Sequence, residues 1–438
     1  MKTPITQRGI TYLFSILFLS LNLLPVSTTN AQQDNDQLLK LLVQKKLIRP
    51  GEADSLRIPA ATEEPANIKF KRGGKVWGLA YVDAIYKAHA DSAKRGNLQY
   101  SAQAKDSAGL DFRRIYLGYD YAISERFSTQ LILSNESGGD VVSDGNRSVF
   151  IKAASLRWAN IFSLSDLTIG IQQTPTFVFT GDRDGVVWEY RSVERSIADQ
   201  RKLSPSTDAG VQLSGKLNTA GTVGYNLMVG DGSGTKPENT RFQRFYGDVY
   251  AKFFNKHLVL DLYADYDRSR LTPFHQSVST VKVLLAYQSK RFTLGAEAVQ
   301  QNQQNASFYT EAKIGNPEVI GIRKDTADAL VLGLSGFVQV KLIKDWLGAF
   351  ARYDYFNPDL NFASKNFYTS AYTGNTVQHF ITAGLDFSPE KNVHIIPNVW
   401  YNDYTSSSDG SVNVHPSSLA LHDYDFVYRI TLYYTFNR

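Results

Sequence analysis

The C-terminal stretch YDFVYRITLYYTF, residues 424–436, alternates residue by residue between an apolar set and a mixed set. A period of two is that of a β-strand with two unlike faces. One face is apolar and largely aromatic, whereas the other carries Asp425 and Arg429, which is typical of a strand between lipid and water. Phe436 fits the aromatic residue that commonly ends the closing strand, although two residues follow it. The stretch predicts an outer-membrane β-barrel, with a half-buried strand of a soluble sandwich as the alternative.

The N-terminal end of the chain predicts export. Lys2 and Arg8 precede an apolar run over residues 10–24, Pro25 breaks the run, and small residues at 29–31 offer a cleavage point. We therefore expect residues 1–31 to be a signal peptide. No later stretch has the roughly 20 consecutive apolar residues of a membrane helix. A closed barrel is then the membrane architecture that remains.

Composition and charge agree with this prediction. The 438 residues include no cysteine, and a closed sheet whose backbone groups are all paired needs no disulfide. The chain has 47 basic and 42 acidic residues, and removal of Lys2 and Arg8 with the signal leaves 45 against 42, or +3. Such a small excess does not indicate a nucleic-acid partner.

Residues 32–69 differ from the rest of the chain. Leu, Ile and Val recur at helical spacing between residues 36 and 57, Pro50 suits the start of a second short helix, and residues 58–66 form a linker rich in Pro and Ala. We expect a short periplasmic helical segment that serves oligomerisation or contact with the cell wall. The alternative is a loosely ordered leader.

The pattern of residues 70–438 predicts an all-β domain, a 16-stranded antiparallel transmembrane β-barrel. Short polar turns broadly alternate with long loops, as when the short turns lie on the periplasmic side and the long loops outside. Sixteen strands leave an aqueous channel. Pro397 falls inside the fifteenth strand, where we expect a local bulge. The expected strands are 76–89, 110–121, 127–137, 149–160, 166–174, 207–217, 222–230, 245–254, 257–269, 279–289, 291–301, 328–342, 346–356, 376–387, 392–404 and 423–436.

Six stretches occur in an order and spacing that one known family shares. They are GIQQTP (170–175), WEYRSVER (188–195), DAGVQLSG (208–215), FARYDYF (350–356), AGLDF (383–387) and IPNVWY (396–401). On these stretches the chain resembles the phosphate-selective porins of Gram-negative outer membranes, the porin O and P family, from about residue 36 to the end. The resemblance implies a homotrimer of sixteen-stranded barrels, each with a long third loop that folds into the pore and narrows it.

The connection over residues 175–206 is the longest between the expected strands, and we expect it to form the inward-folded constriction loop. A loop inside a pore must satisfy its backbone there, and paired charges on loop and wall achieve this while leaving a hydrated opening. An extracellular lid with solvated charges is the alternative. Besides Trp188 and Tyr190, the loop holds five basic residues (Arg183, Arg191, Arg195, Arg201, Lys202) and five acidic ones (Asp182, Asp184, Glu189, Glu194, Asp199).

The charges do not predict selectivity for phosphate. The resemblance associates phosphate transport with loop lysines and a ladder of arginines, because successive cationic sites let an anion move from one to the next. The loop here has one lysine and no net charge. From the alternation along each strand, we expect nearly equal numbers of basic and acidic side chains to face the lumen. The basic ones are Arg114, Lys216, Lys282, Arg291, Lys341, Arg352 and Arg429, and the acidic ones are Asp83, Asp208, Asp261, Asp265, Glu297, Asp354, Asp386 and Asp425.

Other motifs are weak. Residues 182–185 and 231–235 resemble fragments of calcium loops, but turn chemistry explains both. The seven histidines have no metal-binding spacing. His379 is the nearest candidate for a catalytic set, and a wall histidine is the simpler interpretation. We expect no cofactor, no metal site and no enzymatic activity.

The sequence favours an outer-membrane porin of a Gram-negative bacterium that admits small hydrophilic solutes by passive diffusion, with a mild preference for anions or phosphate. One alternative is a channel for sugars or other neutral solutes, in which Trp188, Tyr190, Trp346 and Trp400 form a sliding surface. Another is a plugged barrel with a structural or binding role. The expected partners are the lipid bilayer, lipopolysaccharide, the barrel-assembly machinery and further copies of the chain.

Overall fold

The computed structural model describes residues 44–45, 72–96, 98–136, 147–181, 185–237, 242–271, 275–312, 321–362, 366–368, 376–406 and 422–437. The chain divides into two units, Met1–Lys69 and Phe70–Arg438. The predicted signal peptide and, apart from residues 44–45, the predicted leader lie outside the described residues. In the described part of the chain, no helix is both long and apolar enough to cross a membrane.

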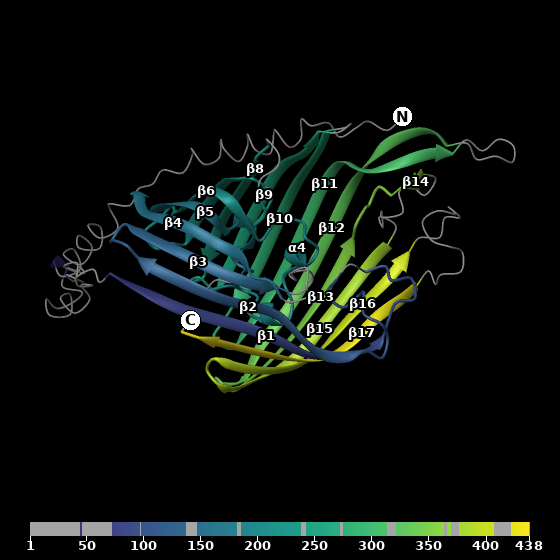
Figure 1. Cartoon of the computed structure of the whole chain (residues 1–438). Coiled ribbons are helices and arrows are strands. Elements are labelled where there is room, and N and C mark those ends of the chain that lie inside the picture. The colour runs from purple at the N-terminus through teal and green to yellow at the C-terminus, as the bar shows by residue number, and fades with distance from the viewer. Residues whose placement is uncertain are drawn as a thin grey trace. The chain divides into compact units, whose positions relative to one another are not determined.

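The second unit consists almost entirely of strands, as the alternating sequence predicts (Figure 1). The strands are β1 (Gly73–His89), β2 (Ala108–Ala122), β3 (Phe127–Glu136), β4 (Phe150–Phe162), β5 (Ser165–Gln173), β6 (Thr207–Lys216), β7 (Val223–Gly230), β8 (Arg244–Phe253), β9 (Leu258–Leu271), β10 (His275–Gln288), β11 (Phe292–Ala312), β12 (Gly321–Ile343), β13 (Leu347–Asn357), β14 (Asn366–Tyr368), β15 (Thr376–Glu390), β16 (Val393–Ser406) and β17 (His422–Phe436).

Each strand pairs antiparallel with its neighbours, and the sheet closes on itself. β1 pairs with β2 on one side and with β17 on the other, where Gly78 lies opposite Phe436. The wall has sixteen strands, because the short β14 pairs with the far end of β11 while β13 pairs directly with β15. Closure gives each of the sixteen wall strands two partners, which a structure in lipid requires. The predicted 16-stranded barrel is confirmed.

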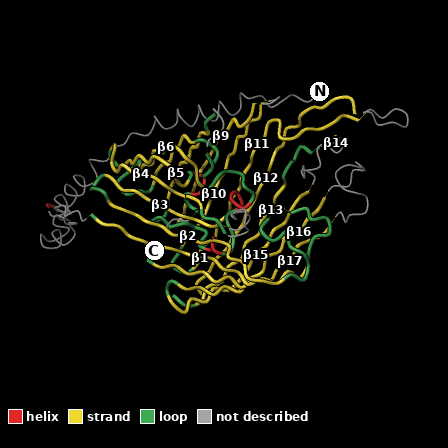
Figure 2. The backbone as a smooth tube through the Cα atoms, in the orientation of Figure 1, coloured by secondary structure: helices red, strands yellow, loops and turns green. Residues whose placement is uncertain are grey.

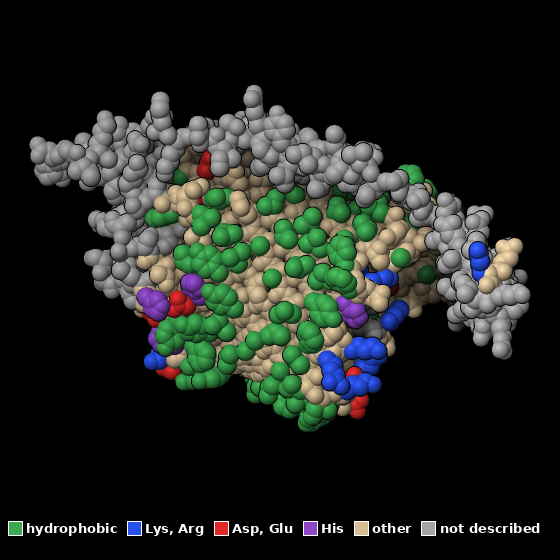
Figure 3. All heavy atoms as spheres, turned by 180° about the vertical axis from the view of Figure 1, so that it is seen from behind, with side chains coloured by type: hydrophobic (Ala, Val, Ile, Leu, Met, Phe, Trp, Pro, Cys, Tyr) green, Lys and Arg blue, Asp and Glu red, His purple; other side chains and the backbone are tan. Residues whose placement is uncertain are grey.

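Alternation decides which face of the wall each side chain occupies. On β10, Val281, Val283 and Leu285 are exposed, Leu285 at 47%. Lys282, which lies between Val281 and Val283, is 2% exposed. Figure 3 shows apolar side chains spread over one outer face and charged side chains gathered at its margins. An apolar band around a closed barrel is the surface of a protein that spans a bilayer with strands. The protein is therefore a multi-pass β-barrel of the outer membrane.

The β11–β12 hairpin is longer than predicted. We expected a loop over residues 302–326, but the two strands stay paired as far as Ala312 and Gly321. The missed part begins in QQNQQN (300–305), which is polar at every position. Beyond the lipid, neither face of a strand meets an apolar environment, so the alternation that marks a spanning strand is absent.

The expected bulge at Pro397 is wrong. Pro397 pairs with Ile430 in unbroken register on β17, and the register with β15 is the same on both sides of the proline. Pro397 and the residue before it have no paired residue on β15, as expected where a proline lacks the N–H donor. The wall therefore absorbs the proline by losing hydrogen bonds and keeps its register.

Because the chain has no cysteine, single cysteines can report the assigned faces. With the barrel in lipid vesicles, a fluorophore on Val283→Cys should be quenched by spin-labelled lipid, since Val283 faces outward. Ser155→Cys should instead react with a membrane-impermeant thiol reagent, since Ser155 lines an internal cavity. The opposite pattern would contradict the register of the wall.

Candidate functional site

The β5–β6 connection, residues 175–206, forms the interior of the site; we call its described residues, 175–181 and 185–206, the 175–206 segment. It contains the short helices η1 (Pro175–Phe177), η2 (Tyr190–Ser192) and α4 (Ile197–Gln200), drawn red in Figure 2. Inward side chains of the wall donate hydrogen bonds to its backbone carbonyls. The donors and acceptors are Lys282 to Thr176 (2.7 Å), Gln288 to Val186 (3.0 Å), Gln339 to Val187 (3.0 Å), Gln301 to Leu203 (2.6 Å), Arg113 to Ser192 and Arg352 to Arg195.

An apolar patch inside the barrel anchors this segment. Trp188 is 1% exposed and packs edge-on against Phe337 (5.2 Å between ring centroids) and Phe350 (6.1 Å). Tyr190 stacks on Phe350 at 4.2 Å. The inward positions of β9, β10, β12, β13 and β16 contribute to the same cluster. We did not predict this patch, although its signal is present: Leu284, Phe337 and Phe350 occupy lumen positions where a wet wall has polar residues.

Two cations of the segment share one carboxylate. Asp199 pairs with Arg191 (2.6 Å) and lies 3.6 Å from Arg195. Burial alone raises the pKa of the Asp199 carboxyl, but the guanidinium groups of Arg191 and Arg195 outweigh burial and hold the pKa below its usual value. Asp199 is therefore ionised at neutral pH and fixes Arg191 in position.

Two β-bulges direct additional cations inward. The register between β1 and β2 shifts after Tyr81, so that Arg113 and Arg114 are both buried on the inner face. A shift between β3 and β4 does the same for Lys152 and Ala153. A bulge places two consecutive residues opposite one partner residue. It therefore breaks the alternation from which we predicted which side chains face the lumen. Arg113 and Lys152 were missed for this reason.

The bulged cations have carboxylate partners on the wall. Glu136 accepts Lys152 at 2.8 Å and Arg114 at 3.4 Å. Asp83 pairs with Arg113 at 2.8 Å. Arg114 and Lys152 also contribute to lowering the pKa of Asp199, which places the wall cations and the 175–206 segment in one electrostatic cluster.

The remaining predicted site residues are placed as follows. Lys282, Arg352 and Arg429 are buried at inward positions, as strand phase predicts. The prediction that Arg291 lines the lumen is wrong. Arg291 is exposed in the turn between β10 and β11, because β11 begins one residue later. Arg183 lies outside the described residues. In the segment, Glu189 and Lys202 are exposed, Glu194 is buried and accepts from Trp400 (3.2 Å), and Arg201 is buried against Gln378 and Phe356.

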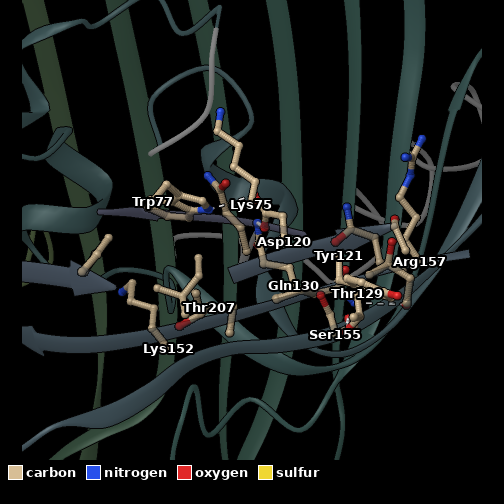
Figure 4. A pocket seen from close by; sticks show the side chains of 18 of the residues that line it. Lys75, Trp77, Asp120, Tyr121, Thr129, Gln130, Lys152, Ser155, Arg157 and Thr207 are labelled. Carbon is tan, nitrogen blue, oxygen red and sulfur yellow. Dashed lines mark hydrogen bonds between the residues drawn. The ribbon is translucent and has the colours of Figure 1, made fainter. Parts of the chain in front are cut away.

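The segment leaves open a cavity of about 860 Å³ between itself and the wall from β1 to β6. Figure 4 shows side chains that line it, and those labelled there belong to the wall. The segment contributes Phe177, Arg191 and Ser206. Most are small or polar, and the charged ones are Lys75, Lys152, Arg157 and Arg191 against Asp120 and Asp166. A second cavity of about 410 Å³ lies between the segment and strands β1, β10, β16 and β17, and Arg191 lines both.

Two of the weaker motifs have structural explanations, whereas residues 182–184 of the third lie outside the described residues. Asp208 accepts hydrogen bonds from the amides of Gly232 (2.8 Å) and Gly234 (3.0 Å), so it organises the 231–235 turn that resembled a calcium loop. His379 contacts the Tyr353 hydroxyl (2.7 Å) on the exposed side of the wall. The described residues contain no group of three or more His, Cys, Asp or Glu side chains placed to hold a metal ion.

Several solved structures are similar to this one. They include the outer-membrane channel DcaP of Acinetobacter baumannii (13% identity, TM-score 0.56, 84% of this chain and 98% of that one) and the anion-selective porin from Comamonas acidovorans (10%, 0.56, 84% and 100%). OmpT of Vibrio cholerae is another (12%, 0.52, 83% and 97%). These neighbours show the fold. No protein-family model and no curated protein matches the chain.

Trp188→Ala is expected to loosen the 175–206 segment. Deleting a buried tryptophan costs about 3–5 kcal/mol, and Trp188 is the largest side chain that joins the segment to the wall. Single-channel conductance should therefore become larger or noisier. The matched control is Trp346→Ala, since Trp346 is 48% exposed. Equal conductance for the two variants, both folded by gel mobility, would mean that Trp188 does not hold the segment.

The lowered pKa of the Asp199 carboxyl predicts how the conductance depends on pH. Its pKa in the folded protein lies below the usual value of about 3.9. The stabilisation that it contributes is therefore fully present above about pH 4 and is lost as the pH falls through the lowered pKa. Conductance should be constant from neutral pH to about pH 4 and change as the pH falls further. Asp199→Asn should lack this acid transition, and a transition near neutral pH that persists in Asp199→Asn would contradict the assignment.

Proposed function

We propose that this protein is an outer-membrane porin through which small hydrophilic solutes diffuse passively, with a mild preference for anions. The observation that carries the proposal is the cavity of about 860 Å³ beside the 175–206 segment, whose lining includes many Ser, Thr and Gln side chains. Polar side chains of this kind can hydrogen-bond water and small hydrophilic solutes. The porins among the structural neighbours have the same barrel fold.

The charge of the cavity lining supports the preference for anions. Four basic side chains face two acidic ones, and Arg157 with Asp166 forms a pair (2.6 Å). Lys152 and Arg191 line the cavity, while their carboxylate partners Glu136 and Asp199 are not among its lining residues. A passing solute therefore meets the cationic side of each pair. In a narrow passage with low-dielectric walls a small net charge is enough to bias ion flow.

A tight phosphate site is not part of the proposal. Lys152 and Arg191 already bind carboxylates at 2.8 Å and 2.6 Å, so a phosphate would have to compete with a fixed internal anion. Weak, rapidly reversible contacts are what a diffusion pore requires.

In this proposal the 175–206 segment is the constriction, and the partners are the lipid bilayer, lipopolysaccharide, the barrel-assembly machinery and two further copies of the chain. A trimer form is recorded for the neighbour OmpT of Vibrio cholerae, at 12% identity and a TM-score of 0.50. No enzymatic activity is proposed.

Neutral solutes are the second candidate. The abundance of Ser, Thr and Gln in the cavity, with Trp77 and Tyr116 beside them, suits sugars as well as ions. The sliding surface that we expected for such solutes does not form: Trp188 and Trp400 are buried in packed clusters, and Trp346 is exposed in the turn between β12 and β13.

Planar-bilayer recordings test the proposal. The wild-type protein should form open channels whose reversal potential in a KCl gradient indicates weak anion preference. Lys152→Glu should move this potential toward cations, because it reverses a charge of the cavity lining. Lys344→Glu is the control, since Lys344 is exposed in the turn between β12 and β13.

Three results would contradict the proposal. A folded barrel without conductance would indicate a plug. Equal shifts for Lys152→Glu and Lys344→Glu would remove the cavity from the ion path. Block of chloride current by about micromolar phosphate, which corresponds to about 8 kcal/mol of binding, would reveal a tight site.

A further inference from the structure

A second connection also folds into the lumen. It joins β1 to β2, and its described residues, 90–96 and 98–107, are called the 90–107 segment. The sequence predicted an external loop here. Tyr100 is instead fully buried: its ring meets that of Trp400 edge-on at 5.7 Å, and its hydroxyl donates to Asp83 Oδ2 at 2.5 Å. Trp400 on β16 and Asp83 on β1 both occupy inward positions, so the segment lies against the inner face of the wall.

Lys87 on β1 fixes this segment. Its ammonium group is fully buried and has three N–H donors. Three acceptors surround it: the carbonyl oxygens of Tyr100 (2.7 Å) and Ser101 (3.1 Å), and Asp425 Oδ1 (2.9 Å). A buried ammonium is stable when all its donors are satisfied. Because two of the three acceptors belong to the segment, the lysine specifies where the segment sits.

Other contacts join the segment to the closing strands. Arg95 pairs with Asp91 (2.6 Å) within the segment and donates to Ser406 Oγ (3.1 Å) on β16. The amide of Asp91 donates to Asp425 Oδ1 (2.9 Å) on β17. The segment thus covers the inner face of β15, β16 and β17. The apolar side chains there that it helps to bury are Phe380, Trp400 and Val427.

The two internal segments meet at Asp83. This carboxylate accepts from Tyr100 of the 90–107 segment and from Arg113 Nε (2.8 Å). Arg113 in turn donates to the Ser192 carbonyl of the 175–206 segment. The Asp83–Arg113 pair therefore links the two segments through the wall.

We propose that the 90–107 segment is a second size-selective element of the pore, held in place by Lys87. It occupies the lumen beside β15–β17, and with the 175–206 segment it confines the solute path to the side of β1–β6. This inference rests on the proposed function, because size selection requires a conducting pore.

Lys87→Met tests the inference. The substitution removes the ammonium group that joins the Tyr100 and Ser101 carbonyls of the segment to Asp425 of the wall, so the segment should leave the wall. The prediction is a larger single-channel conductance and a shift of the cut-off in polymer-exclusion recordings toward larger polyethylene glycols. The control is Lys105→Met, which removes the same charge from an exposed position of the same segment and should behave as wild type.

A chemical probe gives a second readout that needs no conductance. Ser101 is 4% exposed, whereas Ala104 is exposed. In vesicles, Ser101→Cys should resist a membrane-impermeant maleimide in the otherwise native chain and react when combined with Lys87→Met. Ala104→Cys should react in both backgrounds, which shows that the reagent reaches the segment.

The outcomes separate the two proposals. A wild-type barrel without conductance contradicts the proposed function, whereas the maleimide experiment still tests the segment. A conducting barrel in which Lys87→Met and Lys105→Met have the same polymer cut-off overturns the inference. Unchanged protection of Ser101→Cys in a folded Lys87→Met protein overturns the role of Lys87.

Discussion

An apolar surface inside a water-filled barrel is stable when something covers it, and this constraint organises the whole lumen. From β9 to β17 the inner wall carries large apolar side chains, among them Leu284, Phe350 and Trp400. Two connections fold inward and bury them. From β2 to β6 many inward side chains are Ser, Thr or Gln, and water can remain there. The distribution of side chains along the inner wall therefore decides on which side of the barrel an open path lies.

The charged side chains inside the barrel fall into two groups with different roles. Much of the near balance between lumen acids and lumen bases lies in buried pairs such as Lys282 with Asp261 and Arg352 with Asp354, at 2.8 Å and 2.5 Å. These pairs hold wall and segments together and are shielded from solutes. In the proposed function, solutes meet the few charges that line the cavity, where bases outnumber acids. A charge count over the whole lumen therefore does not describe what an ion encounters.

The alternation of apolar and polar side chains made the strands predictable. The features that we missed are those that do not follow this alternation. All sixteen spanning strands were found because lipid on one face imposes a period of two. Arg113 and Lys152 were missed because a bulge depends on the pairing of two strands and leaves no local pattern. The inward course of residues 98–107 was missed because its cause lies elsewhere: Trp400 and Phe380, some 300 residues later, need a cover.

The internal contacts are made between parts of the chain that are far apart in sequence. Tyr100 meets Trp400, Arg95 meets Ser406, and Trp188 meets Phe350. Contacts of such separation raise the contact order of the chain, which slows folding. The 90–107 segment lies near the start of the barrel sequence, whereas the strands on which it docks, β15, β16 and β17, are the last three in the chain. The lumen beside these strands can therefore take its narrow shape when the C-terminal end of the chain is in place.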